Sequence, residues 1–237
     1  MSVDCTVVIP VGPLPVHQRW LAETIQSVRE QTHEVRQILI IDDMAGIPWS
    51  PSLTIWHAPW RLGVASAFNC GVALAQYELV FMLGSDDWIE PTCIEECVSY
   101  YETHCQPKDE YMAVPIFIHR EDGSVTQELS AANAAMVTKT LWRNCGGFPL
   151  ASTLAAPDAA LHQVFADHPE AGKVIMIGDN PLYHYRYHKE SATALLRDEL
   201  PKIGHLELNG EPLSLLDLVR KLSSEFWCPP AWGRLRP

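Results

Sequence analysis

Two pairs of adjacent aspartates stand at the ends of apolar runs in this 237-residue sequence. Asp42 and Asp43 close the run RQILII, and Asp86 and Asp87 follow LVFML and a Gly-Ser link. Neighbouring carboxylates repel each other, so they are tolerated where water, a metal ion or a bound ligand compensates their charge. Open α/β sheets bind ligands at the carboxyl ends of their strands. The two pairs therefore predict a ligand site at one edge of a buried sheet.

Each pair also has a simpler explanation. Asp42 and Asp43 could end a strand in solvent, and Asp86 and Asp87 could cap a helix or prepare the turn before Pro91. Capping explains one aspartate of the second pair and leaves the other without a reason. We therefore favour the ligand site for both pairs.

The segments that position these pairs alternate between strand and helix patterns. We expect strands over 7–11, 36–41, 53–57 and 79–83, and helices over 19–31, over 64–75 and after Pro91. This order predicts an α/β protein with a mostly parallel, Rossmann-like central sheet flanked by helices, in a single domain. Further strands are expected over 111–119 and 174–177, and a helix through Leu161 and Phe165. In YHYRYH, alternation would place the three tyrosines on one face and His184, Arg186 and His188 on the other.

Composition narrows the class of protein. The formal charge is −12, which disfavours an extended nucleic-acid footprint because such a footprint needs several cations against phosphates. No apolar run approaches the roughly 18 residues of a membrane span, and the N-terminus lacks the pattern of a signal peptide. Seven cysteines without CxxC spacing favour reduced thiols, with Cys93 and Cys97 in the core. We expect a cytoplasmic protein.

Six motifs, spread in order from about residue 5 to about residue 193, resemble those of glycosyltransferase family 2, the inverting enzymes with the GT-A fold. VVIPV resembles the family's first strand, and IIDD resembles its strand-end carboxylates. Arg61-Leu62-Gly63 with the later AFNCG is similar to the NxG…ARNxG helix, and LGSDDWIEP to the DxD motif. CGGFP resembles the GGF turn, and PLYHYRYHKES the YRxHxxS segment.

The resemblance implies a GT-A domain over residues 1–200, with a nucleotide-sugar half over about 1–110 and an acceptor half over about 111–200. Residues 201–237 would form a helical C-terminal extension. Its apolar face within 212–226 favours core packing first, a homodimer contact second and a membrane surface third.

The resemblance also implies the roles of particular residues. Asp158 would be the catalytic base, and Asp86 with His188 would hold Mn²⁺ or Mg²⁺. Gly146, Gly147 and Asp87 would lie on the acceptor and sugar side. The donor nucleotide, expected to be UDP, would be bound by Pro10, Val11, Asp42, Asp43, Arg61, Asn69, Ser85, Asp86, Arg186 and His188.

Three positions depart from the family pattern. Gly84 stands where the first aspartate of DxD is expected, Phe68 replaces the arginine of ARN, and Pro157 replaces the first acid of the pair around the base. These departures motivate a second hypothesis, a non-catalytic protein that binds nucleotides or glycans. A sugar-nucleotide pyrophosphorylase is a third, but VGPLPVHQRW lacks the glycine-rich, arginine-bearing loop that such enzymes place after the first strand.

The first hypothesis is a glycosyltransferase of the hexosyltransferase type that acts on a hydroxyl acceptor. A glycan or a lipid-linked sugar is the expected acceptor. A hydroxymethylated base in viral DNA is a further option, which the negative charge disfavours.

Overall fold

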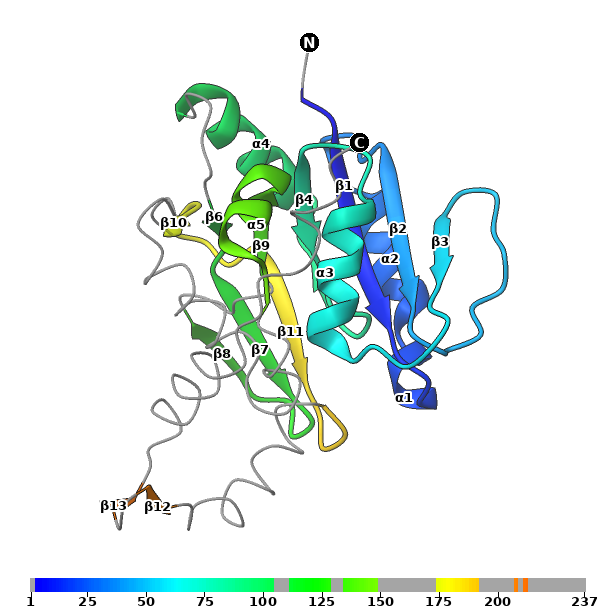
Figure 1. Cartoon of the computed structure of the whole chain (residues 1–237). Coiled ribbons are helices and arrows are strands. Elements are labelled where there is room, and N and C mark those ends of the chain that lie inside the picture. The colour runs from blue at the N-terminus through cyan, green and yellow to red at the C-terminus, as the bar shows by residue number, and fades with distance from the viewer. Residues whose placement is uncertain are drawn as a thin grey trace.

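The computed structural model describes residues 3–104, 111–128, 134–148 and 174–191, together with two short strands over 207–208 and 211–212. Within these residues, a seven-stranded sheet has the strand order β10-β6-β9-β4-β1-β2-β3 (Figure 1). Strands β1 to β4 are Cys5–Val11, Gln37–Asp42, Thr54–His57 and Leu79–Met82. β6, β9 and β10 are Tyr111–Ala113, Ala135–Thr138 and Val174–Met176.

The sheet is mostly parallel, as predicted. β1 runs parallel to β2 and to β4, and β2 parallel to β3, so the carboxyl ends of these four strands share one edge. β9 is antiparallel to both of its neighbours, β4 and β6. The two aspartate pairs follow β2 and β4 and therefore lie at the same edge.

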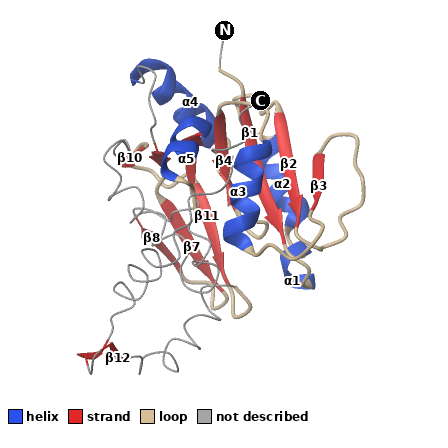
Figure 2. Cartoon of the chain, in the orientation of Figure 1, coloured by secondary structure: helices blue, strands red, loops and turns tan. Residues whose placement is uncertain are grey.

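Helices cover both faces of the sheet (Figure 2). α2 (Leu21–Arg29) and α4 (Cys93–His104) contribute Ile25 and Ile94 to one core cluster, which also contains Ile9 of β1. α3 (Val64–Leu74) and α5 (Lys139–Cys145) pack on the other face, around Val8 of β1. Alternate residues of β1 thus enter different cores, which explains the unbroken apolar run of this strand. The remaining helix among the described residues is the short α1 (Pro15–Gln18).

A second sheet of four strands, ordered β5-β11-β7-β8, lies beside the first. Its strands are Trp88–Ile89, Tyr183–Tyr187, Ile116–Arg120 and Val125–Glu128. The prediction of a single strand over 111–119 was wrong. The strand is interrupted at Val114–Pro115, and the two parts, β6 and β7, belong to different sheets. Pro115 has no N–H for a strand ladder, and its carbonyl oxygen accepts a hydrogen bond of 3.0 Å from the N–H of Leu182.

Other expectations concern the first helix, the C-terminal region, the cysteines and membrane-spanning helices. The expected helix over 19–31 is found as α2, Leu21–Arg29, and the short α1 precedes it. The expected helix through Leu161 and Phe165 lies outside the described residues, as do residues 213–226 of the expected C-terminal helix. At the start of that helix, Glu211–Pro212 is instead a short strand, β13, which pairs with β12 (Glu207–Leu208). Five cysteines are free thiols in the described part of the chain, and Cys93 and Cys97 are fully buried, as expected. No helix among these residues has the length and apolar character needed to cross a membrane.

Candidate active site

The turn after β4 is held from behind by α2. The hydroxyl of Thr24 lies 2.7 Å from the carbonyl oxygen of Asp87. The N–H of Ile89 donates to Ser27 Oγ at 3.3 Å. Gln31 Nε2 donates to the carbonyl of Glu90 at 2.8 Å. Thr24 and Ser27 are buried on one side of α2, and Gln31 is buried just after its end, so their polar groups fix residues 85–90.

Asp86 is the exposed member of its pair, and a histidine from the second sheet meets it. The distance from Asp86 Oδ2 to His188 Nε2 is 3.1 Å, and the two side chains are 25% and 4% exposed. The second ring nitrogen of His188, Nδ1, is buried without a hydrogen-bond partner among the described residues. Two residues that are 102 positions apart thus form one polar contact at the sheet edge.

Asp87 points away from solvent. Its carboxylate accepts hydrogen bonds from Tyr183 Oη at 2.5 Å and from the N–H of Arg186 at 2.8 Å. Burial, and then the neighbouring charge of Asp86, raise the pKa of Asp87 well above its ordinary value. A Cβ atom at Gly84 would lie 2.5 Å from Asp87 Oδ2, so the carboxylate fills the space of a side chain at position 84. Glycine at that position is therefore required by the placement of Asp87.

The first aspartate pair organises the loops beside the turn. Asp43 accepts hydrogen bonds from the N–H groups of Leu62 and Gly63, at 2.6 and 2.9 Å, and forms an ion pair of 2.9 Å with Arg61. This carboxylate is 3% exposed, whereas Arg61 is half exposed. Asp43 thereby sets the loop that begins α3 and holds a cation at the edge of the site.

Asp42 serves the loop that follows β2. Its carboxylate accepts from the N–H groups of Ala45, Gly46 and Ile47, and Nδ1 of His57 lies 2.6 Å from Oδ2. Burial alone would raise the pKa of Asp42, but the hydrogen bonds from His57 and the three N–H groups outweigh it and lower the pKa. Both of its oxygens therefore have partners within the protein.

Asn69 connects α3 with the Gly-Gly turn after α5. Its Oδ1 accepts from the N–H of Phe148 at 2.9 Å and from Trp142 Nε1 at 3.1 Å, and its Nδ2 donates to the Phe148 carbonyl at 2.8 Å. Gly146 ends α5 in a left-handed conformation. A Cβ atom at Gly147 would lie 2.4 Å from Asn69 Oδ1, so the turn closes tightly on this amide.

The other predicted residues lie around these contacts. Val11 is buried in the core, its carbonyl oxygen accepts the N–H of Asp43 at 2.9 Å, and Pro10 is half-buried in β1. Ser85 is buried in the turn, with its carbonyl oxygen 3.0 Å from the Thr24 hydroxyl. Asp158 lies outside the described residues.

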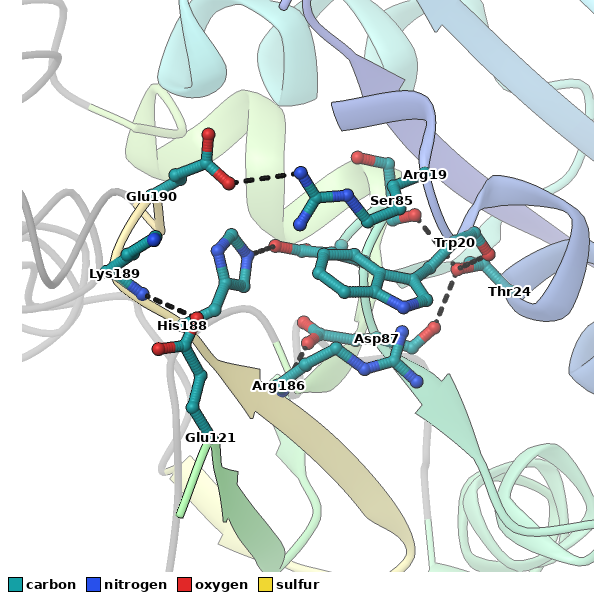
Figure 3. A network of polar contacts seen from close by, with 12 residues as sticks. Arg19, Trp20, Thr24, Ser85, Asp87, Glu121, Arg186, His188, Lys189 and Glu190 are labelled. Atoms are coloured by element: carbon teal, nitrogen blue, oxygen red, sulfur yellow. Dashed lines mark hydrogen bonds and ion pairs between the residues drawn. The ribbon is translucent and has the colours of Figure 1, made fainter. Parts of the chain in front are cut away.

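Arg186 lies between two indole rings. Its guanidinium carbon is 4.6 Å from the ring centroids of both Trp20 and Trp88, and Nη2 forms an ion pair of 2.9 Å with Glu23. Figure 3 shows Arg186 beside the Trp20 indole. Nη1 is buried without a hydrogen-bond partner among the described residues. As predicted for a strand, Tyr183, Tyr185 and Tyr187 all pack toward the core.

His17 was missed by the sequence reasoning. Its ring covers Gly12 at the end of β1, and a Cβ atom on Gly12 would lie 2.3 Å from His17 Nδ1 and 3.0 Å from Arg61 Nη1. Burial lowers the pKa of His17, and the charges of Arg61, Asp86 and Asp43 also act on it. The ring of His17 thus lies where one aspartate of each pair acts on it, but a single histidine gives no sequence pattern from which this could be predicted.

No group of three or more His, Cys, Asp or Glu side chains suited to a metal ion occurs in the described segments. The protein offers Asp86 and His188 as a pair. Mg²⁺ and similar ions commonly take one or two protein ligands and complete their shell with substrate phosphates and water. Ligands on adjacent positions of such an ion, with bonds of about 2.1 Å, are about 3 Å apart, close to the observed spacing of this pair. The donor set therefore fits an ion shared with a phosphate-bearing ligand.

Comparison with known proteins agrees with the fold. Residues 13–123 match the family profile Glycosyl transferase family 2. The structure resembles S. aureus TarS 1–349 in complex with UDP-GlcNAc, with a TM-score of 0.64 and 13% identity over 97% of this chain and 73% of that one. The complex of the same TarS fragment with UDP gives a TM-score of 0.61 at 13% identity, over 94% and 70%. A search of curated proteins gave no match. Residues 13–123, somewhat less than half of the chain, thus match glycosyltransferase family 2, and the chain has the GT-A fold of these structures.

Proposed function

We propose that the protein transfers a sugar, with inversion, from a UDP-linked donor to a hydroxyl acceptor, assisted by a divalent ion at Asp86 and His188. The observation that carries the proposal is the contact between these two side chains at the carboxyl edge of the sheet. The fold is shared with TarS structures that contain UDP and UDP-GlcNAc, which motivates the choice of UDP.

Unsatisfied nitrogen atoms beside the Asp86–His188 pair support a phosphate-bearing ligand. Arg186 Nη1 and His188 Nδ1 are both buried and have no partner among the described residues. Leaving such groups without a partner is costly, and phosphate oxygens would supply acceptors. When bound, Mn²⁺ or Mg²⁺ would neutralise the charge that develops on the leaving diphosphate.

The acceptor side rests on the sequence. Asp158 would take the proton from the acceptor hydroxyl as the sugar is transferred, which is the task of a general base. A glycan or a lipid-linked sugar is the proposed acceptor, and the charge of −12 disfavours DNA. We further propose that the transferred sugar is a hexose and that the transfer takes place in the cytoplasm.

A thermal-shift series with UDP, GDP, CDP and dTDP, each with and without Mn²⁺, tests the donor site. A ligand that binds only the folded state raises the unfolding midpoint, so one nucleotide should give a shift that needs the ion. Asp86→Asn should abolish the Mn²⁺-dependent part. Asp179→Asn is the matched control because it makes the same substitution at an exposed position. A wild-type protein without any shift would contradict the proposal.

One observation favours the non-catalytic binder as a second candidate. The carboxylate of Asp87 fills the space at Gly84, so the first aspartate of DxD has no room in this arrangement. Slow release of the sugar to water from UDP-linked donors separates the two candidates. A transferase hydrolyses some donor and loses this activity in Asp86→Asn, whereas a binder shows a nucleotide-dependent shift without hydrolysis.

A further inference from the structure

A column of stacked cations and rings runs beside the Asp86–His188 pair. The guanidinium of Arg19 lies 4.9 Å from the Trp20 centroid, and that of Arg186 lies 4.6 Å from it. Figure 3 shows the Trp20 indole between these two groups. On its other side Arg186 contacts Trp88, which stacks on His184 at 4.7 Å with an angle of 8°.

Carboxylates contact three members of this column. Glu190 pairs with Arg19 at 3.1 Å, Glu23 pairs with Arg186 at 2.9 Å, and Glu90 Oε1 lies 2.8 Å from His184 Nε2. Arg186 is 16% exposed, so its contact with the rings is largely desolvated and stronger than a surface contact. The column joins the junction of α1 and α2 to strands β5 and β11.

Trp20 also contacts His188. The two ring centroids are 5.0 Å apart, at an angle of 49°. His188 is 4% exposed, and the only hydrogen bond of its ring among the described contacts is the one to Asp86. A single hydrogen bond does not fix the plane of an imidazole, and the contact with Trp20 restricts that plane further. The column in turn limits the plane of Trp20.

We propose that Trp20 is a positioning residue, whose indole, fixed between Arg19 and Arg186, holds the His188 ring in the orientation that directs Nε2 at Asp86. The consequence of this orientation for catalysis rests on the proposed function. The orientation of the ring itself does not depend on a bound metal or nucleotide. Substitution of a residue that orients a metal-binding histidine commonly lowers metal affinity or activity 10- to 100-fold.

The first test is NMR of the His188 ring in the protein without metal or nucleotide. In the wild type the ring should give a single, sharp set of signals, since it is held in one orientation between Trp20 and Asp86. In Trp20→Leu these signals should broaden or double, and Trp20→Phe should lie between the two. Trp49→Leu is the matched control because that indole is 80% exposed. Unchanged ring signals in both Trp20 variants would overturn the proposal.

The second test is a double-mutant cycle that reads Mn²⁺-dependent UDP binding. Trp20→Leu should weaken this binding about 10- to 100-fold in the wild type, and should have no further effect when His188→Ala is present. Arg19→Met, which removes one cation–π contact, should weaken it about two- to fivefold. Losses that simply add would show that Trp20 does not act through His188.

The two tests fail separately. If the wild type shows no Mn²⁺-dependent UDP binding, the proposed function fails, while the ring NMR still decides the role of Trp20. If Trp20→Leu does not fold, Trp20→Phe keeps an aromatic ring in the column and carries both tests.

Discussion

The hydroxyl of Tyr183 donates a hydrogen bond of 2.5 Å to the carboxylate of Asp87, and accepts one of 3.1 Å from the N–H of Gly84. Burial and the nearby carboxylate raise the pKa of Tyr183 well above its ordinary value, so the hydroxyl stays protonated and can donate. Asp87 thereby links the turn after β4 to β11. Asp86 is left as the aspartate of this pair that faces solvent.

Gly84→Asp, which restores the DxD pattern, should destabilise the protein. The new Cβ would lie 2.5 Å from Asp87 Oδ2 and 3.1 Å from Asp86 Oδ1, and a third carboxylate would join the two. Overpacking of a tight site costs about 1–3 kcal/mol of unfolding free energy, which urea denaturation measures. Gly84→Asp with Asp87→Gly should recover part of the loss. A single variant as stable as the wild type would show that the turn adapts.

Asp87→Asn should change how stability depends on pH. The folded-state pKa of Asp87 is raised by burial and by Asp86, so its contribution is fully present below the unfolded pKa of about 3.9 and is lost as pH rises through the folded value. Relative to Asp87→Asn, the wild type should therefore lose unfolding free energy as pH rises above about 4. Urea titrations of both proteins over a pH series measure the difference. A constant difference would contradict the raised pKa.

Local sequence patterns predicted the elements that carry the site. Period and length predicted β1, β2, β4 and α3, because these buried segments have long apolar runs or faces. The approach of His188 to Asp86 was expected through the family resemblance, since nothing local relates residues 102 positions apart.

The contacts that hold the site could not be predicted in the same way. Thr24, Ser27 and Gln31 look like ordinary polar residues of a surface helix, yet they are buried against the turn after β4. Trp20 gains its role from Arg186 and His188, which come from another sheet. The break between β6 and β7 depends on a second sheet that the sequence pattern did not reveal.

Gln31→Leu should lower the free energy of unfolding more than the same substitution at an exposed glutamine. The amide accepts from the N–H of Ile94 at 2.9 Å and donates to the Glu90 carbonyl at 2.8 Å. Leucine would remove both hydrogen bonds and leave the buried N–H of Ile94 without this acceptor, whereas the Glu90 carbonyl keeps the hydrogen bond of 3.0 Å from the N–H of Cys93. We expect a loss of about 1–3 kcal/mol for the N–H of Ile94. Gln26→Leu, on the exposed side of α2, should change stability by less than about 0.5 kcal/mol. Equal effects in urea denaturation would contradict the assignment.

Asn69→Leu should affect both stability and turnover. Leucine would remove the hydrogen bonds that Asn69 makes with Trp142 Nε1 and with the N–H and carbonyl of Phe148, at a cost of about 1–3 kcal/mol for each group that is left unpaired away from water. The sequence that follows Phe148 leads to Asp158, so a displaced turn should lower kcat for sugar transfer while KM for the donor nucleotide changes little. Ser66→Ala, one turn earlier in α3, is the control for a general effect on the helix. A rise in donor KM with unchanged kcat would instead place Asn69 at the nucleotide, as the family resemblance implies.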